Sequence, residues 1–100
     1  MTQPDKTPKW LDLTLERATI QLSVPAMVND VRVDSLTMRS PTVKDQLDCR
    51  QVAGDDDARY ELQMFCSLTE VRNKDLEALQ TRDYRRLQAA FLRLEDMDGL

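Results

Sequence analysis

The feature that most constrains the fold is an alternating segment with a turn in its middle. Between residues 19 and 39 apolar side chains recur at every second position, and Asn29-Asp30 interrupts them. Period-two alternation is typical of half-buried strands, and both Asn and Asp tolerate the positive φ angles of a two-residue type I′ turn. The sequence therefore predicts a β-hairpin that pairs residues 19–28 with residues 31–39.

The two halves of this hairpin do not match in phase. Plain pairing across the turn places Leu22 opposite Thr37, which sets an apolar side chain against a polar one. One extra residue on the return strand, near Asp34-Ser35, removes the mismatch. We therefore expect a β-bulge in that strand, with Pro25 close to it, where the missing N–H of proline costs little.

A shorter alternation precedes the hairpin. Leu11, Leu13 and Leu15 occupy odd positions, whereas the first hairpin strand alternates on even ones. A break must separate the two patterns, and the earlier one leaves room for a third strand. Residues 1–9 contain two prolines and few apolar side chains, so we expect a disordered segment there, followed by a single domain over residues 10–98.

Helical spacing begins after the hairpin. Thr42 and Asp45 match a capping box at the start of a first helix, and Gly54 is expected to end it. Val43 and Leu47 lie one turn apart and are expected to begin its buried stripe.

The remaining helices complete the expected fold. A second helix over about residues 56–69 has an apolar arc that covers more than half of its circumference, so we expect it to lie between neighbours at the centre of the domain. A short helix over about 73–79 and a last helix over about 81–97 follow. The predicted class is α+β, a bulged N-terminal hairpin followed by three to four helices.

The composition excludes most catalytic chemistry. The chain has no histidine and only two glycines, so it lacks the commonest general base and any glycine-rich phosphate loop. Cys49 and Cys66 are not in a CxxC spacing and are expected to be reduced core thiols. The acidic run 55–57 lacks the pattern of a calcium loop. We expect no enzymatic activity, no metal, no cofactor and no small-molecule substrate.

The charge and hydropathy patterns restrict the classes of partner that the protein is expected to bind. The net charge of −4 gives no drive toward nucleic acid or an anionic membrane surface. No stretch approaches the roughly 18 apolar residues of a membrane-spanning helix, and the first ten residues do not resemble a signal peptide. These features favour a cytoplasmic protein that binds other proteins.

The order and spacing of several short motifs resemble the tail assembly chaperone family of contractile-tailed phages and prophages, of the Mu-like and related kinds. The resemblance covers roughly residues 18–95, and its motifs are Arg39, Pro41-Thr42, Asp45 with Leu47, Ser67-Leu68-Thr69, Asp75-Leu76 with Leu79, and Asp83-Tyr84 with Leu87. Two positions depart from the family pattern. Gln46 interrupts the usual Asp-Leu pair, and Glu70-Val71 replaces a frequent glycine.

The resemblance implies a function that the composition alone does not. Such a chaperone binds the tape measure protein and keeps it soluble during tail-tube assembly, with the tail-tube protein as a further potential partner. It acts in the bacterial host cytoplasm and is not expected in the mature virion. Two alternatives stay open: a small structural or accessory protein of the virion tail, and an acidic regulator that binds another protein.

A partner surface is expected at the margins of the apolar helix faces. Tyr60 and Met64 lie at the rim of the central helix, and Leu92 points away from the apolar face of the last helix. We predict that these three side chains contribute to binding the client or a second copy. The edge of the hairpin is a further candidate for self-association, because an unpaired strand edge templates pairing.

Overall fold

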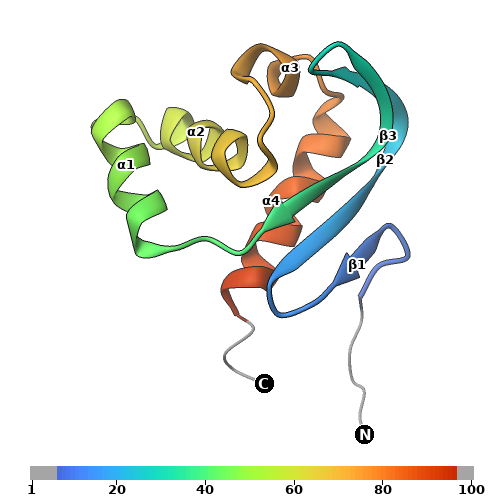
Figure 1. Ribbon diagram of the computed structural model, residues 1–100, viewed down its shortest axis with the longest axis horizontal. Coiled ribbons are helices and arrows are strands. Elements are labelled where there is room, and N and C mark those ends of the chain that lie inside the picture. The colour runs from blue at the N-terminus through green and yellow to red at the C-terminus, as the bar shows by residue number, and fades with distance from the viewer. Residues whose placement is uncertain (1–6, 97–100) are drawn as a thin grey trace, which may run out of the picture.

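The computed structural model describes residues 7–96, which form a three-stranded antiparallel sheet followed by four helices (Figure 1). The predicted α+β class is confirmed, and the third strand is present. The elements are β1 (Leu11–Leu13), β2 (Arg17–Val28), β3 (Val31–Arg39), α1 (Val43–Ala53), α2 (Asp57–Thr69), α3 (Asn73–Glu77) and α4 (Thr81–Glu95). Residues 1–6 of the expected disordered segment, and Met97 at the expected helix end, lie outside the described residues.

The sheet has the order β1-β2-β3, so β2 lies in the middle. The turn between β2 and β3 is the predicted one: Asn29 and Asp30 have φ angles of 52° and 68°, and Val28 pairs with Val31. The hairpin register is therefore set by a two-residue turn that places both central residues in the left-handed region.

The bulge lies in the other strand from the one expected. Gln21 pairs with Ser35 and Ala26 pairs with Val33, so residues 22–25 of β2 stand opposite Asp34 alone. The expectation of one extra residue in β3 was wrong in strand and in size, because β2 carries three extra residues. Any odd number of extra residues on either strand corrects the phase, so the apolar pattern does not distinguish these solutions.

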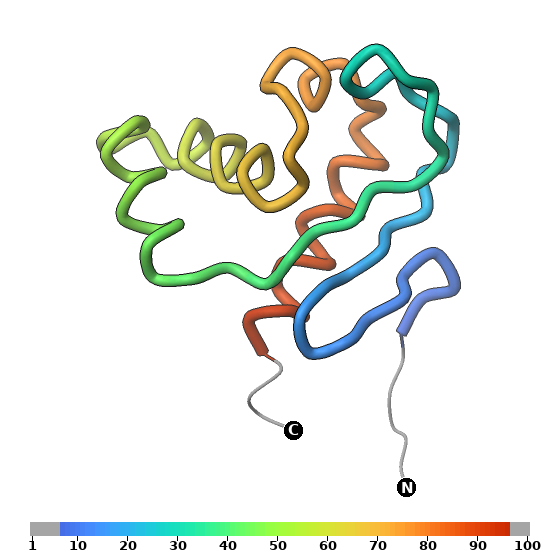
Figure 2. Tube along the Cα trace, in the orientation of Figure 1, coloured from blue at the N-terminus to red at the C-terminus, as the bar shows by residue number. Residues whose placement is uncertain are grey.

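The core lies between the inner face of the sheet and the helices. Figure 1 shows α4 running behind β2 and β3, with α1 and α2 together on one side of the sheet. The tube in Figure 2 shows α3 beside the hairpin turn. The fully buried Phe65 of α2 meets two rings of α4, Tyr84 and Phe91, with ring centroids 5.4 and 5.5 Å away. The prediction of a central second helix is therefore confirmed.

The first helix, α1, buries fewer side chains than its sequence predicted. Its capping box is present, since the Thr42 hydroxyl accepts from the Asp45 N–H and the Asp45 carboxylate accepts from the Thr42 N–H. Gly54 follows it with a φ of 60°. Val43 and Leu47, however, are 71% and 67% exposed, so the expected buried stripe was wrong. The only buried residue of α1 is Cys49, because α1 packs chiefly against α2.

Within residues 7–96, no helix combines the length and the apolar character needed to cross a membrane.

Candidate partner-binding surface

Three helix starts are tied to the hairpin by carboxylates at the same helical position. Asp45, Asp75 and Asp83 are each the third residue of their helices, α1, α3 and α4. This position suits a carboxylate because the N–H groups of the first turn carry a partial positive charge. All three side chains belong to the motifs on which the family resemblance rests.

Asp45 joins the start of α1 to the end of β3. Its two carboxylate oxygens accept hydrogen bonds from the Arg39 guanidinium, both at 2.8 Å. The guanidinium, together with hydrogen bonds from Thr42, holds the pKa of the Asp45 carboxyl well below its usual range. The short connection between β3 and α1 is thereby fixed by a bidentate ion pair.

Asp75 joins the start of α3 to the hairpin turn. Its carboxylate accepts from the Asn29 N–H at 2.9 Å and from the Arg72 guanidinium at 3.2 Å. The Asn29 side chain also donates to the Glu70 carbonyl at 3.1 Å. The backbone hydrogen bond from Asn29, followed by Arg72, lowers the pKa of Asp75. The far end of the hairpin is therefore held against the segment that joins α2 and α3.

Asp83 joins the start of α4 to the bulge of β2. It is 1% exposed and accepts from both the N–H and the hydroxyl of Ser23. The Arg86 guanidinium lies 3.9 Å from the same carboxylate. These contacts place α4 along β2, and they are structural rather than available to a partner.

Helices α1, α2 and α4 surround an open hollow with a volume of about 270 Å³. We call it the α2–α4 hollow, because most of its lining residues belong to α2 and one, Phe91, belongs to α4. Met64 and Phe65 are buried and form its inner side, and Phe91 of α4 packs edge-on against Phe65. Its lining residues are Arg50, Asp57, Tyr60, Glu61, Met64, Phe65 and Phe91. The hollow therefore combines an aromatic interior with charged side chains at its margin.

One margin of the hollow is fixed by Arg50 of α1. Its guanidinium lies 3.8 Å from the centroid of the Tyr60 ring and 3.1 Å from the Asp57 carboxylate. It also donates to the Gly54 carbonyl at 3.1 Å. These contacts orient the Tyr60 ring beside the hollow, and they connect α1 to α2.

Glu61 also lines the hollow. Its Oε1 atom accepts from the Tyr84 hydroxyl at 3.0 Å and from the Gln88 amide at 2.9 Å. Burial first, and then the negative charge of Glu61, raise the pKa of Tyr84, so the phenol keeps its proton and remains a donor. Both groups that hold Glu61 in place are therefore neutral.

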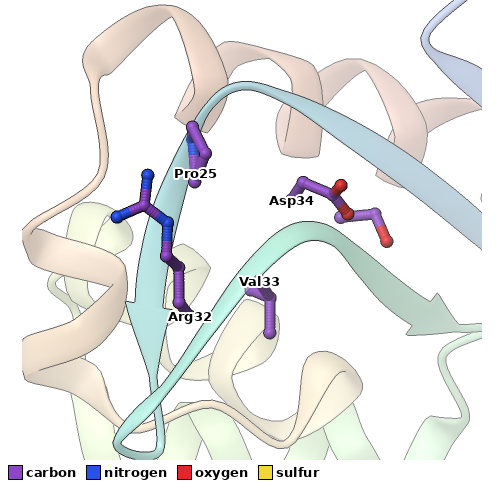
Figure 3. A pocket seen from close by; sticks show the side chains of 5 residues that line it. Pro25, Arg32, Val33 and Asp34 are labelled. Carbon is purple, nitrogen blue, oxygen red and sulfur yellow. The ribbon is translucent and has the colours of Figure 1, made fainter.

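A second hollow, of about 450 Å³, lies at the bulge of the hairpin. Figure 3 shows Pro25 on β2 and Arg32, Val33 and Asp34 on β3, where the two strands separate. Ser35 completes the lining. This second hollow contains no aromatic side chain, so it offers less than the α2–α4 hollow to an apolar partner.

The three predicted partner residues have different surroundings. Tyr60 is half-buried beside the α2–α4 hollow. Met64 lines the same hollow but is 1% exposed, so it lies at the bottom rather than at the rim as expected. Leu92 is 63% exposed and follows Phe91 in α4, but it does not line the hollow. The structure thus brings Tyr60 and Met64 together and leaves Leu92 apart.

Sequence reasoning missed Phe91, Glu61 and Arg50 at this surface. Phe91 follows the apolar spacing of the last helix, but spacing predicts only a helix face and not which neighbouring helix that face meets. Glu61 and Arg50 lie among many charged residues, and only the fold shows that they border an aromatic hollow. No sequence signal distinguishes them from other charged residues on exposed helix faces.

No group of His, Cys, Asp and Glu side chains among residues 7–96 is arranged to hold a metal ion. Both cysteines in this range are buried and unpaired. The Cys66 thiol donates to the Asn73 side-chain oxygen at 2.7 Å. Burial raises the pKa of Cys66 to about 11 and also raises the pKa of Cys49. These thiols are therefore protonated at neutral pH and serve as core residues.

Comparison with known protein families identifies a match over most of the chain. A family model described as "Phage tail assembly chaperone proteins, E, or 41 or 14" matches residues 19–96, from β2 through the end of α4. No curated protein and no solved structure matches the chain. The matched segment covers well over half of the sequence and includes every motif on which the resemblance was based. The chain therefore belongs to the phage tail assembly chaperone family.

Proposed function

We propose that this chaperone binds the tape measure protein of its phage and keeps it soluble until tail-tube subunits polymerise around it. Membership of the family supports a chaperone role with protein partners in tail assembly. The observation that carries the specific proposal is the open aromatic hollow between α2 and α4. An amphipathic helix binds such a surface by inserting apolar side chains from one face.

The physical basis of the role is protection of apolar surface. A long amphipathic client exposes an apolar stripe before the tube covers it, and such stripes aggregate. Burying each such side chain against Tyr60 and Phe91 removes it from water and contributes about 25 cal/mol per Å² of apolar area. A contact of this size would bind the client weakly and could be released when the tube assembles, as a transient chaperone requires.

The proposed surface extends beyond the hollow. Leu92, exposed one residue after Phe91, would lengthen the apolar contact along α4. Among residues 7–96, β2 is the strand that pairs with β3, and no other strand lies along the outer edge of β3. We propose this edge as the site of self-association, since unpaired backbone groups favour addition of a strand.

The role requires no catalysis and no cofactor. The protein acts in the host cytoplasm, in contact with the tape measure protein and, as assembly proceeds, with the tail-tube protein. It is released before the virion is complete.

The direct test is co-expression with the tape measure protein. Tyr60→Ala and Leu92→Ala are expected to reduce the fraction of tape measure protein in the soluble lysate and in the co-purified complex. Met27→Ala, which shortens a side chain that is 58% exposed on the hairpin, is the matched control and should leave both unchanged. Met64→Ala is unsuitable, because removing a buried side chain opens a cavity and lowers stability. Equal solubility with folded Tyr60→Ala and Leu92→Ala variants would count against the proposed surface.

Mass spectrometry of purified phage particles separates the chaperone from a structural tail protein. A chaperone should be absent or present in traces, whereas a tail subunit or accessory protein should be found in many copies. Detection of the chain in stoichiometric amounts would overturn the proposed function.

A further inference from the structure

One carboxylate that lines the α2–α4 hollow has hydrogen-bond partners on only one of its two oxygens. Glu61 lines the hollow and is half-buried. Both of its hydrogen bonds, from the Tyr84 hydroxyl and the Gln88 amide, end on Oε1. Among residues 7–96, no donor reaches Oε2, and no Lys or Arg forms an ion pair with Glu61. One oxygen of a positioned carboxylate is therefore left for a donor from outside this part of the chain.

The nearest cation of the hollow does not neutralise this carboxylate. Arg50 is stacked on Tyr60 and paired with Asp57, and it donates to the Gly54 carbonyl. Since Asp57 and Arg50 balance each other, the charged residues of the lining leave one net negative charge, that of Glu61. The surface beside the aromatic interior is thus electrostatically complementary to a cation.

We propose that this hollow recognises a client segment in which a lysine or arginine lies one helical turn from a large apolar side chain. The apolar side chain enters the aromatic interior at Phe91 and Tyr60, and the cation meets Oε2 of Glu61. This inference rests on the proposed function, because it names the chemistry of the tape measure segment that the same surface takes.

The geometry of an amphipathic helix satisfies both requirements at once. Residues three or four positions apart lie on the same face of a helix, so an apolar anchor and a cation reach the hollow together. The methylene stem of a lysine or arginine also covers apolar surface while its charge stays at the margin. Glu61 is held in place by Tyr84 and Gln88, so little side-chain freedom is lost when the cation binds.

The pairing gives the chaperone a way to choose among helices. An aromatic hollow alone would bind the apolar face of any amphipathic helix, including those of host proteins. A carboxylate without a partner at the margin favours segments that bring a cation and disfavours segments that bring an acid, which would be repelled. The inference therefore assigns to Glu61 a role in specificity.

The test compares Glu61→Gln with the natural protein. Glutamine keeps the oxygen that accepts from Tyr84 and Gln88 but removes the negative charge. The control is Glu16→Gln, which removes an equal charge from the exposed turn between β1 and β2. The probes are the co-expressed tape measure protein and synthetic peptides that tile its sequence, with dissociation constants measured at low and high salt and melting temperatures recorded for each variant.

We expect Glu61→Gln to weaken binding about tenfold at low salt, since an ion-paired hydrogen bond is among the stronger polar contacts. The difference should shrink at high salt, because salt screens a partly exposed pair. Replacing the lysine or arginine of the bound peptide by glutamine should abolish the difference between Glu61→Gln and the natural protein. Glu16→Gln should bind like the natural protein.

Two results would overturn the inference in different ways. If Glu61→Gln binds and solubilises the tape measure protein as well as the natural chain, while Tyr60→Ala does not, the role of Glu61 is wrong and the proposed function stands. If the natural chain neither binds nor solubilises the tape measure protein, the proposed function fails and the inference fails with it.

Discussion

Ser23 and Asp83 are 60 residues apart in the chain and are joined by two hydrogen bonds. The Ser23 N–H donates to Oδ1 of Asp83 at 2.8 Å, and the Ser23 hydroxyl donates to Oδ2 at 3.0 Å. A backbone N–H that leaves a strand ladder loses its strand partner and must bond to another acceptor or to water. The carboxylate supplies this partner, so the bulge of β2 and the start of α4 form one structural unit.

Removal of this carboxylate should destabilise the fold more than removal of the hydroxyl. Asp83→Ala leaves the Ser23 N–H without its acceptor and is expected to cost about 2–3 kcal/mol of unfolding free energy. Ser23→Ala removes two hydrogen bonds of the hydroxyl, the one that it donates to Asp83 and the one that it accepts from Arg82. The bond from Arg82 is exposed and adds little, so this variant should cost about 1 kcal/mol. Urea denaturation of both variants gives these values. Asp34→Ala, at an exposed position of β3, is the control, and a loss in Asp83→Ala no larger than in this control would contradict the prediction.

Acid should weaken the connection between β3 and α1. The Arg39 guanidinium lowers the pKa of Asp45 in the folded state, so the carboxylate adds stability at pH values above its unfolded pKa of about 4. This contribution is lost as the pH falls below that value toward the folded pKa. Unfolding free energies of the natural protein and Asp45→Asn should therefore differ clearly at pH 7. The difference should begin to shrink below about pH 4 and should continue to shrink as the pH falls toward the folded pKa.

The pKa of Asp75 is also lowered in the folded state, chiefly by the hydrogen bond from the Asn29 N–H. Protonation of Asp75 should therefore add to the loss of stability in acid. Asp12→Asn, which removes an exposed carboxylate from β1, is the matched control for both. A constant difference between the natural protein and Asp45→Asn from pH 7 to pH 3 would rule out the ion pair as the cause.

The two thiols should react slowly in the folded protein. Burial raises the pKa of Cys66 to about 11 and raises that of Cys49, and only the thiolate is nucleophilic. Iodoacetamide at pH 8 should modify neither cysteine until urea unfolds the chain, as read by intact-mass spectrometry. Rapid modification of either residue in the folded state would show that its surroundings are more open than the structure indicates.

The cap of α1 should contribute to stability but not to binding. Thr42 accepts from the Asp45 N–H at 3.2 Å and donates to the Asp45 carboxylate at 3.0 Å. Thr42→Ala is expected to cost about 1 kcal/mol, measured as a lower melting temperature. The same variant should solubilise the tape measure protein normally, because Thr42 does not line the α2–α4 hollow. An unchanged melting temperature would mean that the cap is unimportant.

The sequence predicted those parts of the fold that depend on neighbouring residues. Asn29-Asp30 predicted the turn, and Thr42 with Asp45 predicted the start of α1. The wide apolar arc of residues 56–69 predicted the central helix. Each of these follows from backbone geometry within a few positions. The proposed partner surface is a different case. The sequence indicated Tyr60 and Met64 from their helix face, whereas Glu61 and Phe91 line the same hollow only when α2 and α4 are brought together.

The hairpin contains a bulge that could not be placed from neighbouring residues alone. Its apolar pattern determined that an odd number of extra residues must lie between the two strands, because only an odd number shifts the alternation by one side of the sheet. Which strand carries them, and whether there is one or three, depends on where an N–H that leaves the strand ladder finds another acceptor. Asp83 provides that partner for Ser23, and a carboxylate 60 residues away becomes a neighbour only in the tertiary structure.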